Sequence, residues 1–311
     1  MNPPNHTEKG FSRKGRIPPH HPKGWKNPEI RKRGPFIVEF RQHLHDGSIL
    51  SLSLRACRKG LLPRLLPERV PAAQPPPRPL LFILSSEQLN GWIGILFMIG
   101  SALFITGSVM SLIQHPQQKL NALVYFTGSI FFTTAAYLQY FQAINAEFPG
   151  DENPEKAPRK SFFAFQPRHL GFWVTFTQFI GTLLFNLNTF SPLWVQTAFQ
   201  ETLFVQAPNT GGSILFMISG TLAMMEVCNG RMGCWRPLEI EWTLTFLNFL
   251  GCVAFLFSAF SASCPPIREK WVCSDAFTLI GAICFFFGAY LTIPETLRHF
   301  CGKEPVWSEA T

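Results

Sequence analysis

Charged residues are absent from the parts of this chain where membrane pumps and membrane metalloenzymes need them. No Asp, Glu, Lys or Arg lies in the interior of the long apolar stretches that fill much of residues 91–294. All eight His residues lie before this region or at the edges of its apolar stretches. Since ionisable side chains within a membrane usually mark a proton or ion pathway, the sequence argues against a proton-coupled pump and an intramembrane metal enzyme.

Catalytic and nucleotide-binding motifs are also lacking. The chain contains no Gly-x-x-x-x-Gly-Lys-[Ser/Thr], no Gly-x-Ser-x-Gly and no His-Glu-x-x-His. We therefore expect no enzyme activity, no catalytic residue, no cofactor and no metal. The charged opening of the chain is not followed by an apolar core, so we expect no signal peptide and a first span that directs its own insertion.

Long apolar stretches dominate what is present. Most approach the ~20 residues that a bilayer core requires of a helix. A run of this kind that is apolar all round belongs to a membrane span more readily than to a soluble core. The sequence predicts an all-α polytopic membrane protein with six transmembrane helices, at about 91–113, 121–143, 171–193, 211–228, 240–262 and 275–294.

Each apolar stretch contains one copy of the same signature, a Gly followed four residues later by Phe. Gly and the small residue after it let helix backbones approach, and Phe fills the space one turn on, so we interpret the signature as helix packing rather than ligand binding. Successive stretches pair into three tandem helical hairpins. The signature residues are Gly100, Phe104, Gly128, Phe132, Gly181, Phe185, Gly212, Phe216, Gly251, Phe255, Gly281 and Phe285.

Basic residues predict the orientation. All but three of the 27 Lys and Arg residues fall on one side if the N-terminus is cytoplasmic; the exceptions are Lys119, Arg268 and Lys270. We therefore expect a transmembrane domain over 89–296 with both termini in the cytoplasm. The C-terminal segment 297–311 is then a short cytoplasmic end.

The N-terminal tail, residues 1–88, is basic and rich in Pro. It carries 16 Lys and Arg against 6 Asp and Glu. This composition predicts a largely disordered cytoplasmic tail. Next to a first span, such a tail is attracted to anionic lipid headgroups, and its tethering to a membrane argues against a nucleic-acid partner.

Amide and hydroxyl side chains form the polar content of the spans. Gln178, Thr182 and Asn186 follow one face of the third span, and Asn248 in the fifth span occupies the position that Gln178 has in the third. These residues either hydrogen-bond neighbouring helices or line a path for a neutral solute.

The even-numbered spans end alike. A polar acceptor stands fourteen residues after each signature Gly, as Gln142, Glu226 and Glu295. These side chains either end the spans at the inner surface or form a shared polar ring there.

Four of the cysteines form two pairs that lie close together in the sequence. Cys264 and Cys273 flank the short loop between the fifth and sixth spans, and a disulfide between them is a possibility in an oxidising compartment. Cys228 and Cys234 lie on the opposite face without His partners, and we interpret them as free thiols.

The signatures resemble a known family. The segment from Gly100-Ser101 to Phe132 is similar to the small YrhK-like membrane domain, and the later signatures, as far as Glu295, resemble its multi-span members. The resemblance covers about 90–296. It implies the hairpin fold and no particular activity.

Three classes of function remain open. The first is a non-enzymatic membrane scaffold or interaction protein, with the bilayer as its partner and a homo-oligomer as an open alternative. The alternative is a transporter or channel-like protein for a neutral or weakly polar solute. An enzyme acting on lipids fits the sequence least. A continuous polar path favours transport, and a dry interior filled by Phe favours a scaffold.

Overall fold

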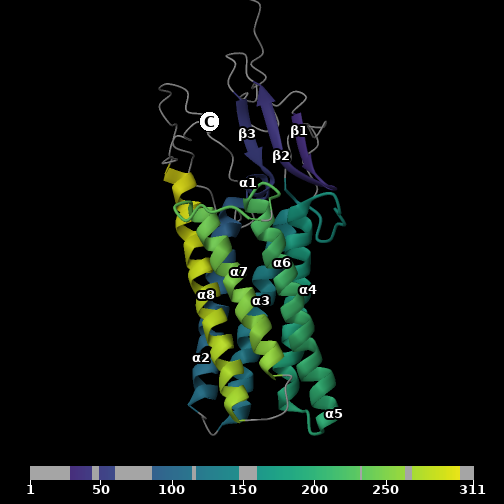
Figure 1. The fold of residues 1–311 in the computed structure, drawn as a ribbon, viewed down its shortest axis with the longest axis vertical. Coiled ribbons are helices and arrows are strands. Elements are labelled where there is room, and N and C mark those ends of the chain that lie inside the picture. Colours follow the sequence, from purple (N-terminus) through teal and green to yellow (C-terminus); the bar gives the residue numbers. More distant parts are fainter. Residues whose placement is uncertain are drawn as a thin grey trace, which may run out of the picture.

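The computed structural model describes residues 29–43, 49–59, 86–113, 117–146, 160–231, 233–262 and 268–301. This part of the chain is mostly helical, and its long helices run side by side along one axis (Figure 1). They are α2 (Ser86–Leu112), α3 (Gln118–Ile144), α4 (Leu170–Phe190), α6 (Ala207–Val227), α7 (Ile240–Ala262) and α8 (Arg268–Cys301).

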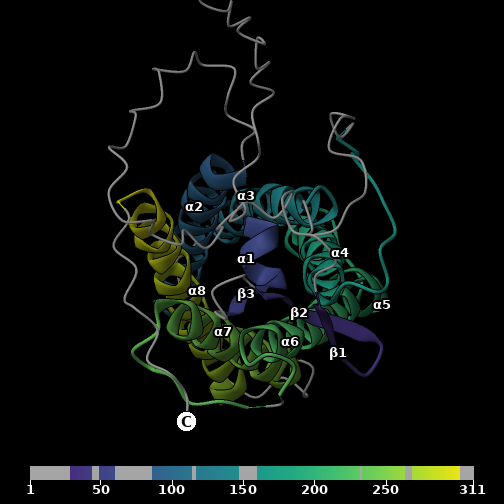
Figure 2. The same ribbon diagram turned by 90° about the horizontal axis from the view of Figure 1, so that it is seen from above.

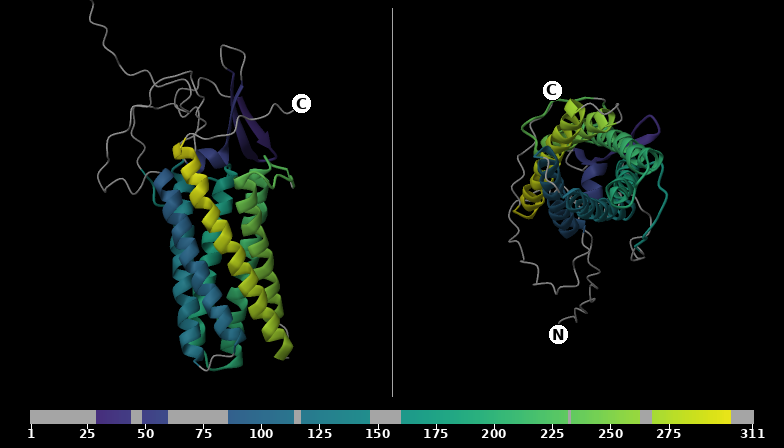
Figure 3. Two further views of the ribbon diagram at one scale, coloured as in Figure 1. Left: turned by 90° about the vertical axis from the view of Figure 1, so that its left-hand side faces the viewer. Right: turned by 90° about the horizontal axis from the view of Figure 1, so that it is seen from below.

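The long helices close into a ring. Each packs against the next along the chain, and α8 packs back against α2 (Figures 2 and 3). Within the described residues, five helical segments are long and apolar enough to cross a membrane, as in a multi-pass membrane protein. They are Gln88–Leu112, Leu170–Leu193, Ala198–Val227, Ile240–Ala262 and Val272–Leu297. Helix α3 is as long as α2 but does not belong to this group.

The fourth apolar stretch is longer than its sequence suggests. A short helix, α5 (Ala198–Glu201), continues through a π-helical turn, η4 (Thr202–Gln206), into α6. Thr197 begins this run with a capping box, in which its hydroxyl accepts from the backbone N–H of Gln200 and the Gln200 side-chain oxygen accepts from the backbone N–H of Thr197. A short 3-10 turn, η3 (Ser191–Leu193), precedes it. The expected start near residue 211 is therefore too late.

The first pair of signature residues shows why Gly is needed. A methyl group added to Gly100 would lie 2.9 Å from the Phe132 ring and 3.0 Å from the carbonyl oxygen of Gly128. One added to Gly128 would lie 2.8 Å from the Phe104 ring and 3.1 Å from the carbonyl oxygen of Gly100. The two backbones touch, so there is no room for a side chain at either position.

The same reciprocal contact recurs between α4 and α6, and one side of it recurs between α7 and α8. Gly181 and Gly212 face each other's carbonyl groups, with Phe216 and Phe185 against them, and Gly281 faces the carbonyl group of Gly251 in the same way. The signature Phe rings pair as well. Centroid separations are 5.3 Å for Phe104–Phe132, 5.0 Å for Phe185–Phe216 and 5.3 Å for Phe255–Phe285.

These three ring pairs meet at the centre of the helix ring. Phe255 lies 5.6 Å from Phe185 and 6.0 Å from Phe104, measured between ring centroids. We call the six signature Phe side chains the Phe cluster. The void among them measures about 10 Å³. That is roughly the space of a single water, so the middle of the bundle is filled.

The N-terminal tail is folded where the structure describes it, and the expectation of a largely disordered tail is wrong for these residues. Three antiparallel strands, β1 (Glu29–Arg33), β2 (Phe36–His43) and β3 (Ile49–Ser53), form a sheet in that order. Phe40 and Leu52 pair across β2 and β3, and both are buried. The short helix α1 (Leu54–Lys59) follows and enters one end of the helix ring (Figure 2).

The expectation that Cys228 and Cys234 are free thiols is wrong. Cys228 and Cys234 form a disulfide, because Asn229 and Gly230 adopt positive φ after α6 and turn the chain back. Cys273, one half of the possible Cys264–Cys273 pair, is a free, exposed thiol on α8. Cys264 lies outside the described residues.

Gly100→Ala and Gly91→Ala form a matched pair on α2. The added methyl at Gly100 forces helices apart, whereas at Gly91 it meets nothing within 4 Å. We expect Gly100→Ala to destabilise by about 1–3 kcal/mol. Gly91→Ala leaves stability unchanged or raises it by up to about 1 kcal/mol. Thermal unfolding in detergent measures both, and equal midpoints for the two variants would contradict the packing account.

The Cys228–Cys234 disulfide tests which side of the membrane this end of the bundle faces. Disulfides persist in oxidising compartments, whereas the distribution of Lys and Arg predicts that this face is cytoplasmic. In a variant that keeps only Cys228 and Cys234, we expect no maleimide labelling in intact cells until a reductant is added. Labelling without reductant would show that the bond is open and that this face is in a reducing compartment.

Candidate functional site

Helix α1 carries three cations on one face into the end of the helix ring. Arg55, Arg58 and Lys59 follow each other at the spacing that places helical side chains together. All three are buried. Because Lys and Arg are almost never fully buried unless paired, their partners define the site.

Two carboxylates of the helix ring pair with these cations. Arg58 Nη2 donates to Glu226 Oε2 at 2.7 Å, and Arg55 Nη2 donates to Glu295 Oε1 at 3.1 Å. The Lys59 ammonium group donates to the second oxygen of Glu295. Arg55 Nη1 also donates to the Thr245 hydroxyl at 2.6 Å. Helix α1 is thereby bound to α6, α7 and α8.

Gln142, the third polar residue predicted at a span end, is linked to α1 through Asn90. Gln142 Nε2 donates to Asn90 Oδ1 at 3.0 Å, and Asn90 Nδ2 donates to the Lys59 carbonyl oxygen at 2.9 Å. The structure thus brings Gln142, Glu226 and Glu295 to one end of the bundle, around a single short helix. They form a shared polar ring whose centre is occupied by the tail.

Because these ion pairs are buried, they hold α1 firmly in its position. Removing one partner of a buried ion pair typically costs about 3–5 kcal/mol, because the other charge is left unpaired. Burial, together with Arg55, lowers the pKa of Lys59 to about 8, and Glu295 opposes this effect. Burial also raises the pKa of the Cys57 thiol on α1 to about 12, so this thiol stays protonated and unreactive.

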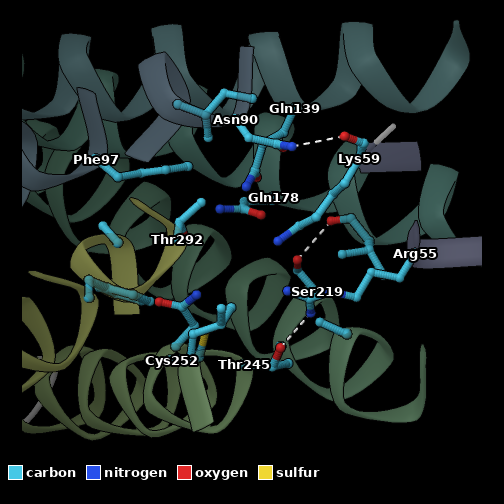
Figure 4. A pocket seen from close by; sticks show the side chains of 18 of the residues that line it. Arg55, Lys59, Asn90, Phe97, Gln139, Gln178, Ser219, Thr245, Cys252 and Thr292 are labelled. Carbon is cyan, nitrogen blue, oxygen red and sulfur yellow. Dashed lines mark hydrogen bonds between the residues drawn. The ribbon is translucent and has the colours of Figure 1, made fainter. Parts of the chain in front are cut away.

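A cavity of about 100 Å³ lies between α1 and the Phe cluster (Figure 4). Its wall near α1 contains Arg55, Arg58 and Lys59, and Phe132 and Phe216 of the Phe cluster are among the residues at its apolar end. In Figure 4, Gln178 extends into the middle, and Lys59 approaches it from α1. Cavities of this size hold several waters or one small molecule.

Three amides on different helices face this cavity without a protein partner. Gln139 of α3, Gln178 of α4 and Asn248 of α7 all line it. Within the described part of the chain, none of the three side chains has a hydrogen bond to another residue. All three amides are only partly buried, so their donors and acceptors are available to water or a solute in the cavity.

The four residues of the predicted polar path do not form one path. Gln178 and Asn248 line the cavity, whereas Thr182 lies at the small void of the Phe cluster and donates to the Phe179 carbonyl at 2.7 Å. Asn186 does not line the cavity, and its buried side-chain oxygen has no hydrogen bond. The Phe cluster interrupts the stripe, so in the described part of the chain these four residues do not line one continuous path.

The sequence pattern does not single out several of the site residues. Arg55, Arg58 and Lys59 stand in it only as part of a basic tail, and Asn90 and Gln139 belong to no pattern. One signal was present in the sequence. Glu226 and Glu295 stand at matched span ends, and two buried carboxylates require cations that the apolar stretches do not supply.

The chemistry of the site is recognition by charge and hydrogen bonds. Among the described residues, no group of three His, Cys, Asp or Glu side chains could hold a metal ion. Comparison with protein-family models, with curated proteins and with solved structures finds no match for this chain. The resemblance to YrhK-like proteins therefore stays a prediction.

The buried thiol of Cys57 reports whether α1 stays in place. With Cys57 as the only cysteine, we expect Glu226→Gln to raise its maleimide reaction rate at least tenfold, because Arg58 loses its partner. The exposed pair of Arg236 and Glu239, 3.5 Å apart, provides the control, and Glu239→Gln leaves the rate unchanged. An unchanged rate in Glu226→Gln as well would show that the ion pair does not hold α1.

Proposed function

We propose that this chain is a membrane protein of the transporter class, which binds a small polar solute in the cavity between α1 and the Phe cluster. The observation that carries the proposal is the set of three amides, Gln139, Gln178 and Asn248, that face the cavity without protein partners. All three amides are half-buried and line the cavity, so their hydrogen-bonding groups are available to a polar solute there.

The proposal includes six transmembrane spans in three tandem hairpins, the arrangement of the YrhK-like resemblance. Helix α3 is then the sixth span. It packs between α2 and α4 in the ring. Its hydropathy is lower partly because of Gln139 and Gln142, and both of these amides belong to the cavity wall, so they need not contact lipid. With an even number of spans, the chain enters and leaves the membrane on the same side. This agrees with Figure 1, in which α1 and the C-terminal end of α8 lie at one end of the bundle.

Two barriers enclose the proposed solute site. Helix α1 covers the cavity on one side, and the Phe cluster fills the bundle on the other. In the described arrangement, α1 and the Phe cluster therefore lie at the two ends of the proposed site. We expect displacement of α1 to widen access to the cavity from its side.

The role we propose is non-enzymatic and membrane-bound. Outside the cavity, the bilayer is the main partner, and anionic headgroups attract the basic residues of the tail that α1 does not use. The second candidate is a scaffold or interaction protein that forms homo-oligomers. It is favoured by the Phe cluster, whose filled interior is typical of a dry helix bundle.

Cysteine accessibility separates the two candidates. In a background without other reactive thiols, we expect Gln178→Cys and Asn248→Cys to react with a small uncharged methanethiosulfonate in membranes. Asn186→Cys is the matched control on α4, outside the cavity, and we expect at least tenfold slower reaction there. Equal silence at all three positions would contradict the solute site and favour the scaffold.

Solute binding by two further variants extends this test. Gln178→Leu and Asn248→Leu remove hydrogen-bonding groups from the cavity while the Gly–Phe contacts of the ring stay intact. We expect both variants to insert and to unfold at temperatures close to that of the parent protein, and to lose solute binding. Misfolding of both would instead assign these amides a role in helix association.

A further inference from the structure

The segment 160–169, between α3 and α4, carries three Phe side chains that the described part of the chain leaves uncovered. Phe162, Phe163 and Phe165 are 69%, 70% and 71% exposed. Single exposed apolar side chains are ordinary, but a contiguous group of large ones marks a contact with another protein or with a membrane. These three rings therefore call for a partner.

The segment folds back along the outside of α3. Tyr140 Oη donates to the Ala164 carbonyl oxygen at 2.9 Å, and Tyr137 Oη donates to that of Phe162 at 3.4 Å. Since α3 ends at Ile144, the two tyrosines stand roughly 6 and 10 Å before its end, at 1.5 Å per residue. None of the segment lines the cavity. It lies beside the helix rather than beyond its end.

The backbone of this segment is satisfied by the protein. The carbonyl groups of residues 161–164, 166 and 167 all accept hydrogen bonds from protein groups. Their donors are, in that order, Asn145, Tyr137, Ser161, Tyr140, His169 and Trp173. In water, solvent can fill this role, whereas in a bilayer the protein has to supply every partner. Outward-facing Phe rings over a satisfied backbone are what a lipid-facing loop requires.

A second loop at this end of the bundle is built in the same way. The indole N–H of Trp173, near the start of α4, donates to the Pro167 carbonyl oxygen at 3.1 Å. That of Trp242, near the start of α7, donates to the Cys234 carbonyl oxygen at 2.9 Å. Trp235 packs against Trp242, with ring centroids 5.0 Å apart, and is 75% exposed. Aromatic rings of this kind are enriched where a membrane meets water.

We infer that residues 161–167 form a membrane-inserted loop, which we call the aromatic loop, and that its partner is the bilayer at the boundary between headgroups and acyl chains. Interfacial apolar segments reach roughly 5–10 Å into this boundary, which matches the position of the loop beside α3. Lys160 and Arg168 flank the loop, and both are exposed, so they meet anionic headgroups. The inference rests on the proposed arrangement in which α3 spans the membrane, and it does not depend on the solute site.

The accessibility of nitroxide labels measures the depth of the aromatic loop. In full-length protein without other reactive thiols, Phe163→Cys, Ile130→Cys and Ile30→Cys are each labelled and placed in nanodiscs. Ile130 is 44% exposed in the middle of α3, and Ile30 is 46% exposed on β1, in the sheet beyond the bundle (Figure 1). We expect the labels at positions 163 and 130 to collide with oxygen in preference to a water-soluble nickel chelate, and the label at position 30 to show the reverse.

The outcomes separate this inference from the proposed function. If position 163 behaves like position 30 while position 130 prefers oxygen, the loop lies in water and the inference alone is wrong. If position 130 prefers the nickel chelate, α3 does not cross the membrane, and the proposed six spans are wrong. If position 163 is shielded from both reagents, protein covers the loop in place of lipid, which also contradicts the inference.

Tyr140→Phe tests whether contacts with α3 hold the loop in the bilayer. The phenol accepts from the Ala164 backbone N–H at 3.2 Å and donates to its carbonyl oxygen, so the variant leaves both groups without this partner. Because such groups are costly in a bilayer, we expect the nickel accessibility of a label at position 163 to rise at least twofold. Thr134→Val is the control, since its hydroxyl bonds only within α3. Equal accessibility in Tyr140→Phe and its parent would contradict the inference.

Discussion

The requirement that buried charges be paired determines how this molecule is organised. Glu226 and Glu295 lie near the ends of α6 and α8, and the apolar stretches of these helices contain no cation to match them. Arg55, Arg58 and Lys59 supply the cations, and to reach them α1 has to enter the ring of helices. The position of the tail, the closure of one end of the bundle and the chemistry of the cavity wall all depend on these ion pairs.

The two halves of the bundle interior serve different purposes. In the half away from α1, Gly–Phe contacts bring helix backbones together and six rings fill the axis, so the helices are fixed relative to one another. In the half next to α1, amides and cations surround about 100 Å³ of free space. A rigid, dry half thus supports a hollow, polar half, as a binding site within a membrane requires.

The sequence predicts the repeating parts of this structure well and the unique parts poorly. Gly100 and Phe132 belong to a pattern that occurs six times, so their packing role is evident from its repetition. The sheet and α1 occur once, and the Pro-rich composition around them conceals the alternation that pairs Phe40 with Leu52. Gln178 was expected to lie on a polar face, but whether that face meets a cavity or Phe rings depends on side chains from three other helices. No local pattern carries that information.

The central claim is that the ion pairs of α1 close a polar cavity, and the rate of thiol modification at position 178 tests it most directly. The rate is measured in membranes for Gln178→Cys alone and together with Glu226→Gln, which leaves Arg58 without its partner. The account predicts that the second substitution accelerates the reaction at least tenfold, because α1 no longer covers the cavity. Equal rates in the two proteins would show that α1 does not control access and would contradict the account.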